Sequence, residues 1–311
     1  MAVPVGNGNR GAGRQGIVTA QRAFRFGVNM VAPDSRTLWI EKCRRAEELG
    51  FDVIGVADHL GCPAPFPSMV LAAESTERVR VNTFVLNTSF YNPVLLARDI
   101  AGADQLTDGR VEIGLGAGYV RSEFESAGIP FESGRKRVAH LERTVNTLRT
   151  LFSDPEYQPR PAQPAGPPLL IAGWGDRLLR LAAENADIIA FPGASATENG
   201  GPLHLAGLAE IGERVEYVRE LLGKRSGSVE FNLLVQRVVP PAERAAVLEL
   251  FGPALPEDVA DRPEELPTLL IGTPDEIADR VRAHRDRYGF SYITVLEHSM
   301  EQFAPVIDLL R

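Results

Sequence analysis

The chain has 311 residues, a formal net charge of −8 at pH 7, and 44% hydrophobic and 24% charged side chains, which is the balance of an ordinary globular protein. The acidic charge argues against nucleic acid or an anionic membrane as the main partner, because those surfaces select for basic patches. Two cysteines without a CxxC pair, and no apolar run near the roughly 20 residues of a membrane span, lead us to expect a cytoplasmic protein.

The N-terminal segment differs in composition from the rest of the chain. Residues 1–22 are rich in glycine and poor in apolar side chains, so we expect a flexible tail there. The remaining residues, 23–311, contain no convincing inter-domain linker and are expected to form one catalytic domain.

From residue 24 onward, short β-branched or aromatic runs alternate with longer segments of helical period, which is typical of βα units. Eight strands are predicted, at residues 24–29, 53–58, 80–86, 111–115, 169–172, 187–191, 229–238 and 292–297. Helices are predicted at residues 37–49, from Pro93 onward, and from the capping box at Thr273 to about residue 288. We interpret the proline-bearing stretches 155–168 and 240–267 as excursions over a barrel face. The pattern predicts a (β/α)8 TIM barrel with insertions.

In such a barrel the active site is built at the carboxyl ends of the strands. The residues that directly follow predicted strands are Asn29, Asp58, His59, Asn87, Gly116, Ala117, Gly118, Tyr119, Gly173, Trp174, Gly175, Pro192, Gly193 and His298. Asp58 and His59 place a carboxylate beside an imidazole, and histidine suits proton transfer near neutral pH. The alternative is that Asp58 caps a loop and His59 packs beneath it.

Two glycine-rich segments also follow strands. Residues 114–118 would let the backbone approach a flat ring or a phosphate, although they lack the GxGxxG spacing and a tight turn is an equal alternative. Residues 172–175 precede a predicted helix whose N-terminus could hold an anion. Trp174 could stack on a ring or simply cover the barrel core. Five histidines without HxH or HExxH spacing make a catalytic metal unexpected.

At this point the residues match a known family. Asp58-His59 and the segments 80–119, 169–175, 186–188 and 271–277 resemble the luciferase-like monooxygenase superfamily, and the resemblance spans residues 24–310. Its most specific parts are the Asn-Pro before the third helix, the Leu-Thr-Asp-Gly-Arg turn and the Gly-Thr-Pro-Asp-Glu-Ile helix start. Within the superfamily the chain resembles the oxidoreductases that use coenzyme F420, a deazaflavin with carbon where flavin has N5.

The resemblance implies a bacterial luciferase-like barrel that holds a tricyclic ring at its mouth, with a non-prolyl cis peptide between Phe84 and Val85. Residues expected to bind the cofactor are Asp58, Thr83, Phe84, Val85, Asn87, Gly116, Gly118, Tyr119, Val120, Ala172, Gly173 and Trp174. His59 occupies the position of the family's acid/base histidine, and Tyr119 is the second candidate proton donor. Arg121, Arg135 and Arg137 could hold the cofactor's phosphate and glutamyl tail, or form a solvated face.

Residues expected to bind the substrate are Asn29, Phe66, Tyr91, Trp174 and His298. Family members that oxidise glucose 6-phosphate carry a glutamate where this chain has Tyr119, and Pro267 stands near one of their basic positions, so that substrate is disfavoured. The aromatic mouth favours a hydrophobic or bulky small molecule or peptide.

The function that the resemblance implies is hydride transfer from reduced F420 to an electron-poor C=C or C=N of a secondary metabolite, one example being dehydroalanine in a modified peptide. The alternatives are an FMN-dependent monooxygenase and a non-catalytic ligand-binding barrel. Related barrels pair through their second and third helices, which implies a homodimer.

Overall fold

The computed structural model of the protein describes residues 22–31, 35–195 and 204–311. The expected flexible tail therefore lies outside the described residues, apart from Arg22. No helix within the described ranges is long and apolar enough to cross a membrane.

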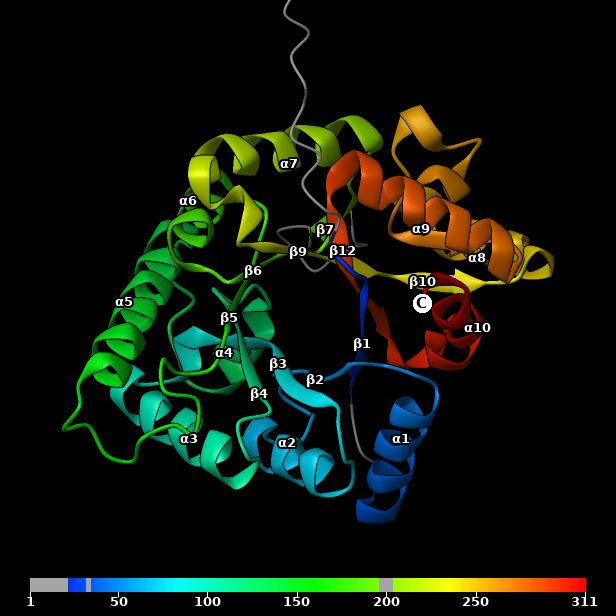
Figure 1. The fold of residues 1–311 in the computed structure, drawn as a ribbon. Coiled ribbons are helices and arrows are strands. Elements are labelled where there is room, and N and C mark those ends of the chain that lie inside the picture. The colour runs from blue at the N-terminus through cyan, green and yellow to red at the C-terminus, as the bar shows by residue number, and fades with distance from the viewer. Residues whose placement is uncertain (1–21, 32–34, 196–203) are drawn as a thin grey trace, which may run out of the picture.

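Parallel strands close into a barrel in which each pairs with its neighbours in the chain and the last barrel strand, β12, returns to β1 (Figure 1). The barrel strands are β1 (Arg25–Met30), β2 (Val53–Val56), β3 (Arg80–Asn87), β4 (Val111–Gly116), β5 (Leu169–Ala172), β6 (Ile188–Phe191), β9 (Glu230–Val235) and β12 (Phe290–Leu296). The predicted (β/α)8 barrel is confirmed.

Helices surround the strands as an outer layer (Figure 1). They are α1 (Arg36–Glu48), α2 (Pro65–Glu74), α3 (Pro93–Leu106), α4 (Arg121–Ser126), α5 (Gly134–Ser153), α6 (Asp176–Asn185), α7 (Leu208–Leu222), α9 (Pro274–Tyr288) and α10 (Met300–Leu310). The predicted starts of two helices are confirmed. Asn92 caps α3 ahead of Pro93, and Thr273 forms a capping box with Glu276 at the start of α9.

Charged side chains fill the amino-terminal end of the barrel. The Arg25 guanidinium lies 2.6 Å from both Glu112 and Glu230, and the Arg80 side chain adds a second contact to Glu112 at 2.7 Å. Both glutamates are buried and each of these residues sits at or next to the start of its strand. This ion cluster closes the bottom of the barrel, so the site must be built at the carboxyl ends of the strands.

The prediction of one strand over residues 229–238 was wrong in its extent. β9 ends at Val235, and β10 (Arg237–Val239) leaves the barrel to pair with β11 (Leu269–Ile271). Both pieces are largely buried. The polar residues Gln236 and Arg237 stand at the break, but Gln236 is itself buried, so polarity alone did not separate the two strands.

The excursion over residues 240–267 lies between β10 and β11. It contains α8 (Arg244–Phe251) and short 3-10 turns, and it is held by its own small apolar cluster. In Figure 1 it lies beside α9, outside the ring of strands. After β6, the short strands β7 (Ala194–Ser195) and β8 (His204–Leu205) pair in antiparallel orientation.

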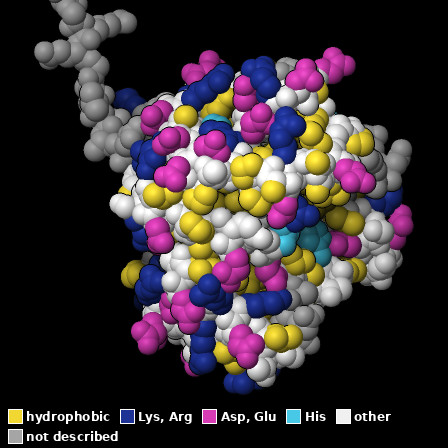
Figure 2. All heavy atoms as spheres, turned by 90° about the vertical axis from the view of Figure 1, so that its right-hand side faces the viewer, with side chains coloured by type: hydrophobic (Ala, Val, Ile, Leu, Met, Phe, Trp, Pro, Cys, Tyr) yellow, Lys and Arg dark blue, Asp and Glu magenta, His cyan; other side chains and the backbone are white. Residues whose placement is uncertain are grey.

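The outer surface carries both signs of charge. Figure 2 shows acidic and basic side chains interspersed among hydrophobic ones on the side of the molecule that carries α10. That face offers no broad patch of a single sign.

Candidate active site

Asp58 joins the ends of two neighbouring strands. Its carboxylate accepts a hydrogen bond from the backbone N–H of Asn87 at 2.9 Å and another from the Tyr91 hydroxyl. Burial raises the pKa of Asp58 in spite of these donors. Asp58 therefore fixes the loop after β3, which agrees with the loop-bracing alternative for this residue.

His59 pairs with a carboxylate that the sequence reasoning did not identify. Its Nδ1 lies 2.8 Å from Glu123 Oε1, and the Glu123 side chain on α4 is only 14% exposed. The Tyr119 ring meets the His59 ring edge-on at 6.0 Å between centroids. Partial burial and the Glu123 carboxylate raise the pKa of Tyr119, so its hydroxyl stays a proton donor. When Nδ1 donates to Glu123, Nε2 is left for chemistry.

Strand β3 bulges where the cofactor ring was expected. The peptide between Phe84 and Val85 is cis, as the resemblance implied, and the pairing of β3 with β4 shifts register between Thr83 and Leu86. Phe84 and Val85 are half-buried and, together with Ala172, pack against the apolar residues of the barrel interior. They present a largely apolar wall near the mouth.

The glycines of β4 accommodate this bulge. A Cβ on Gly114 would lie 2.0 Å from the Thr83 carbonyl oxygen, and one on Gly116 would lie 2.8 Å from Val85 Cγ2. The Thr83 hydroxyl donates to the Gly114 carbonyl at 2.8 Å and accepts from its N–H at 2.9 Å. Close packing between neighbouring strands therefore explains both glycines, whereas their contact with a cofactor stays a prediction.

Gly118 and Asn87 bring the loops after β4 and β3 together. Gly118 has a φ of +73°, and a Cβ there would lie 2.2 Å from Asn87 Oδ1. The same oxygen accepts the Ser89 backbone N–H at 3.2 Å. A side chain at position 118 would push Asn87 away from the mouth, so the two residues form one unit.

Trp174 is held by a second carboxylate that the sequence did not reveal. Its indole Nε1 donates to Glu210 on α7 at 2.6 Å, and its ring lies edge-on to Phe191. The helix that follows, α6, begins with Asp176, which pairs with Arg214 at 2.5 Å. Because an acidic residue already occupies this helix N-terminus, the structure disfavours an anion there.

A basic pair lies beside the Gly118 loop. The guanidinium carbons of Arg121 and Arg137 lie 4.4 and 4.2 Å from the centroid of the Phe131 ring. Arg137 also donates to the Gly118 carbonyl at 3.1 Å, and burial together with the charge of Arg121 lowers its pKa. No carboxylate within the described ranges forms an ion pair with either arginine. The pair can therefore attract an anion. The backbone carbonyl of Arg135 accepts a hydrogen bond from Arg177, and a part for the Arg135 side chain in cofactor binding stays a prediction.

The residues expected to bind the substrate lie in different environments. Asn29 is buried at the end of β1, and the Tyr91 hydroxyl is bonded to Asp58. Phe66 packs against the main core from α2, and His298 is exposed in the turn after β12, where its ring bonds to the backbone of Gln236. Their contact with a substrate, and that of Val120 at the N-cap of α4 with a cofactor, stay predictions.

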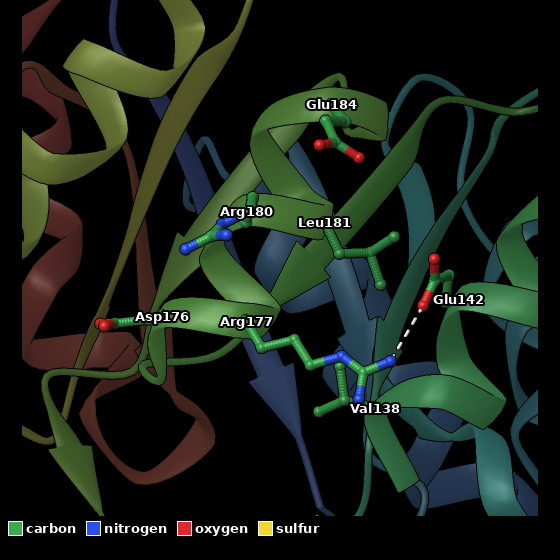
Figure 3. A pocket seen from close by; sticks show the side chains of 7 residues that line it. All are labelled: Val138, Glu142, Asp176, Arg177, Arg180, Leu181 and Glu184. Carbon is green, nitrogen blue, oxygen red and sulfur yellow. Dashed lines mark hydrogen bonds and ion pairs between the residues drawn. The ribbon is translucent and has the colours of Figure 1, made fainter. Parts of the chain in front are cut away.

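One hollow among the described residues lies away from the mouth. It has a volume of about 460 Å³ and lies between α5 and α6 on the outer layer (Figure 3). Figure 3 shows Arg177 reaching from α6 toward Glu142 of α5, with which it pairs at 3.2 Å. Its walls carry arginines and carboxylates in similar number and no group poised for proton transfer, so we place the site at the strand ends instead.

Glu123 and Glu210 are the functional candidates that sequence reasoning missed. Neither directly follows a strand, because Glu123 lies on α4 and Glu210 lies on α7. The sequence contained one usable signal for Glu123. It comes four residues after Tyr119, about one helical turn, so a helix at this point would bring its side chain near a residue already expected at the mouth. No comparable signal marks Glu210, which meets Trp174 from 36 residues away.

Within the described ranges, no group of three histidine, cysteine or acidic side chains is arranged to hold a metal ion. The fold and the site together define a (β/α)8 barrel whose mouth offers a largely apolar wall, an imidazole–carboxylate pair and two arginines that form no ion pair with a carboxylate of the described residues.

The chain belongs to the luciferase-like monooxygenase family, whose model matches residues 24–292. It is 31% identical over 171 residues to the F420-dependent glucose-6-phosphate dehydrogenase of Amycolatopsis mediterranei (strain U-32), a match that covers 48% of this chain and 51% of that protein. It is 28% identical over 173 residues to the 5,10-methylenetetrahydromethanopterin reductase of Archaeoglobus fulgidus, with 53% and 52% covered. The chain therefore matches about half the length of these curated relatives.

A solved structure of the coenzyme F420-dependent tetrahydromethanopterin reductase from Methanopyrus kandleri has the same fold. It superposes with a TM-score of 0.70 at 17% identity, covering 93% of this chain and 100% of that chain.

Proposed function

We propose that this protein is an oxidoreductase that uses coenzyme F420 and reduces an electron-poor C=C or C=N bond. The observation that carries the proposal is the His59–Glu123 pair, at 2.8 Å, which follows the strand next to the Phe84–Val85 bulge. The relatives named for F420 support the choice of cofactor.

The residues present fit the coenzyme. Phe84, Val85 and Ala172 offer half-buried apolar surface for a flat ring. Arg121 and Arg137 offer cations for the phosphate beside the Gly118 loop, where glycine permits close approach. When bound, coenzyme F420 supplies a two-electron hydride carrier that reacts poorly with oxygen.

The chain's own part in the reduction is to position the partners and to move a proton. Hydride addition to one carbon of a polarised double bond leaves an anion on the other atom, and that anion must be protonated. His59 can donate this proton from Nε2 while Glu123 holds Nδ1. The Tyr119 hydroxyl is the second donor within the same group of residues.

The rim favours an apolar or bulky substrate. Val31, Leu60 and Tyr119, which closely follow β1, β2 and β4, are all large side chains at least 46% exposed. Exposed apolar surface at the rim of a site suits the binding of an apolar ligand. A secondary metabolite or a dehydroalanine-bearing peptide fits this rim better than a small anionic sugar.

The test is a titration of the protein with coenzyme F420 and with FMN, followed by tryptophan fluorescence. The chain has two tryptophans, and the buried Trp39 is bonded to Ser68 on α2, so a Trp39→Phe variant reports on Trp174 alone. We expect micromolar or tighter F420 binding with quenching of Trp174. Binding should weaken about tenfold in Asn87→Ala, which loses the contact with Gly118, and should not change in the control Asn185→Ala on α6.

Tight FMN binding without F420 binding would contradict the proposal in favour of a monooxygenase. Binding of neither would contradict both readings and leave a non-catalytic barrel. If F420 binds, consumption of its reduced form in the presence of an activated alkene completes the test.

A further inference from the structure

Three residues lie side by side across the first strands of the barrel. Asn29 of β1 is in register with Gly55 of β2, and Gly55 is in register with Asn82 of β3. All three are buried. Because Gly55 has no side chain, the amide groups of both asparagines approach this glycine from the lumen side, and we call the lumen space in front of Gly55 the gap.

The amide oxygens of these asparagines converge on this gap. A Cβ placed on Gly55 would lie 2.9 Å from Asn82 Oδ1 and 3.3 Å from Asn29 Oδ1. Neither oxygen accepts a hydrogen bond from any residue that the structure describes. The Asn82 amide nitrogen donates to the Tyr292 hydroxyl oxygen at 3.3 Å, which orients the amide oxygen toward the gap. Buried hydrogen-bond acceptors without a donor are rare in proteins. Here two of them, both amide oxygens, approach the same position beside Gly55.

The gap adjoins the wall proposed for the ring. The same point beside Gly55 lies 3.1 Å from Phe84 Cβ, the first residue of the bulge. A donor placed between the two oxygens would therefore sit at the inner edge of a ring that lies on Phe84 and Val85.

We propose that Asn29 and Asn82 together accept the imide N–H of the cofactor's pyrimidine ring. The inference rests on the proposed function, because it concerns how that cofactor is held. The coenzyme's pyrimidine ring carries one N–H between two carbonyl groups, and Asn29 and Asn82 would hold this edge. An amide side chain is complementary to this edge, since its oxygen accepts the N–H while its nitrogen can donate to a neighbouring carbonyl.

Two consequences follow. The imide N–H would be recognised by neutral amide side chains, so this contact adds no charge beside the ring. In addition, flavins and deazaflavins share the imide, so this contact admits both and the choice between them is made elsewhere. Gly55 becomes a specificity residue, because any side chain there would occupy the gap.

The test compares two ligands that differ only at this N–H. The probes are the deazaflavin chromophore without its phosphate tail and the same compound methylated on the imide nitrogen, with dissociation constants measured by fluorescence. We expect the wild-type protein to bind the parent compound at least about tenfold more tightly, as one lost buried hydrogen bond requires. In Asn29→Ala and Asn82→Ala, which make room for the methyl group, this ratio should fall to near one.

Asn232→Ala is the matched control. Asn232 is also a buried asparagine whose amide nitrogen is bonded, to Thr294 and Tyr292, and whose amide oxygen has no donor among the described residues, but it lies on β9, away from Gly55. It should keep the tenfold ratio. Gly55→Ala should weaken the binding of both ligands. Thermal unfolding of each variant checks that the variant is folded.

If the wild-type protein binds both compounds equally well, or if the ratio survives in Asn29→Ala and Asn82→Ala, the gap takes only water and the inference is wrong while the proposed cofactor stands. If it binds neither compound nor F420 itself, the proposed function fails and the inference fails with it.

Discussion

At the scale of single residues, the pair formed by His59 and Glu123 gives the mouth its chemistry. Asp58, the neighbour of His59 in sequence, bonds instead to the loop after β3. The carboxylate that contacts the imidazole comes from 64 residues further along the chain. Two adjacent polar residues thus have different tasks, because they point to different partners.

The variant Glu123→Gln tests whether the Glu123 carboxylate supports proton transfer by His59. Glutamine can still accept from Nδ1 but carries no charge to stabilise the protonated imidazole, so we expect kcat for reduction of an activated alkene to fall about tenfold to a hundredfold. The dissociation constant for F420 should change less than twofold. Steady-state kinetics and fluorescence titration measure the two quantities.

Glu125→Gln, on the exposed side of the same helix, is the control and should leave kcat unchanged. An equal loss in both variants would show that α4 tolerates no substitution and that Glu123 has no special part in proton transfer.

At the scale of elements, the bulge of β3 and the glycines of β4 form one structural unit. The sequence showed glycines at 114, 116 and 118 but not the surface against which they pack. In the structure the first two face Thr83 and Val85, and the third faces Asn87. Close packing between β3 and β4 therefore explains the glycine-rich pattern. The same packing holds the bulge at the mouth.

We expect the contact between α9 and the excursion beside it to be sensitive to acid. His284 of α9 is buried and its ring bonds to the backbone of Glu265, and burial lowers its pKa from 6.5 to about 4. A histidine with a lowered pKa contributes stability that is complete above pH 6.5 and is lost as the pH falls toward 4. We expect this group alone to cost about 3 kcal/mol of unfolding free energy over that range.

His284→Gln keeps a donor for the Glu265 backbone but cannot ionise, so its unfolding free energy should fall less between pH 7 and pH 4.5. Urea denaturation at the two pH values measures the difference. His204→Gln, at an exposed histidine, should behave like the wild-type protein. Equal acid sensitivity of all three proteins would show that His284 is not the responsible group.

At the scale of the whole molecule, one helix has exposed apolar residues that the fold itself does not use. Val94, Leu95 and Leu106 on α3 are each more than half exposed. Single exposed apolar residues are ordinary, but three on one helix agree with the expectation that the protein pairs through its second and third helices.

Light scattering at micromolar concentration should therefore give the mass of a dimer, and Leu95→Glu should shift it toward the mass of a monomer. Leu309→Glu, at an exposed leucine of α10, should leave the mass unchanged. A monomeric wild-type protein would rule out this pairing.

The sequence by itself determined the barrel, its helix starts and the positions of Asp58, His59, Asn87 and Trp174 at strand ends. These features follow from local periodicity and from the rule that parallel strands end at one face. Resemblance added the bulge at Phe84–Val85. Only the tertiary structure decided which carboxylates meet His59 and Trp174, which arginines approach Gly118, and that Asn29 and Asn82 converge beside Gly55. Those are contacts between side chains far apart in the chain, and no local pattern encodes the distance between them.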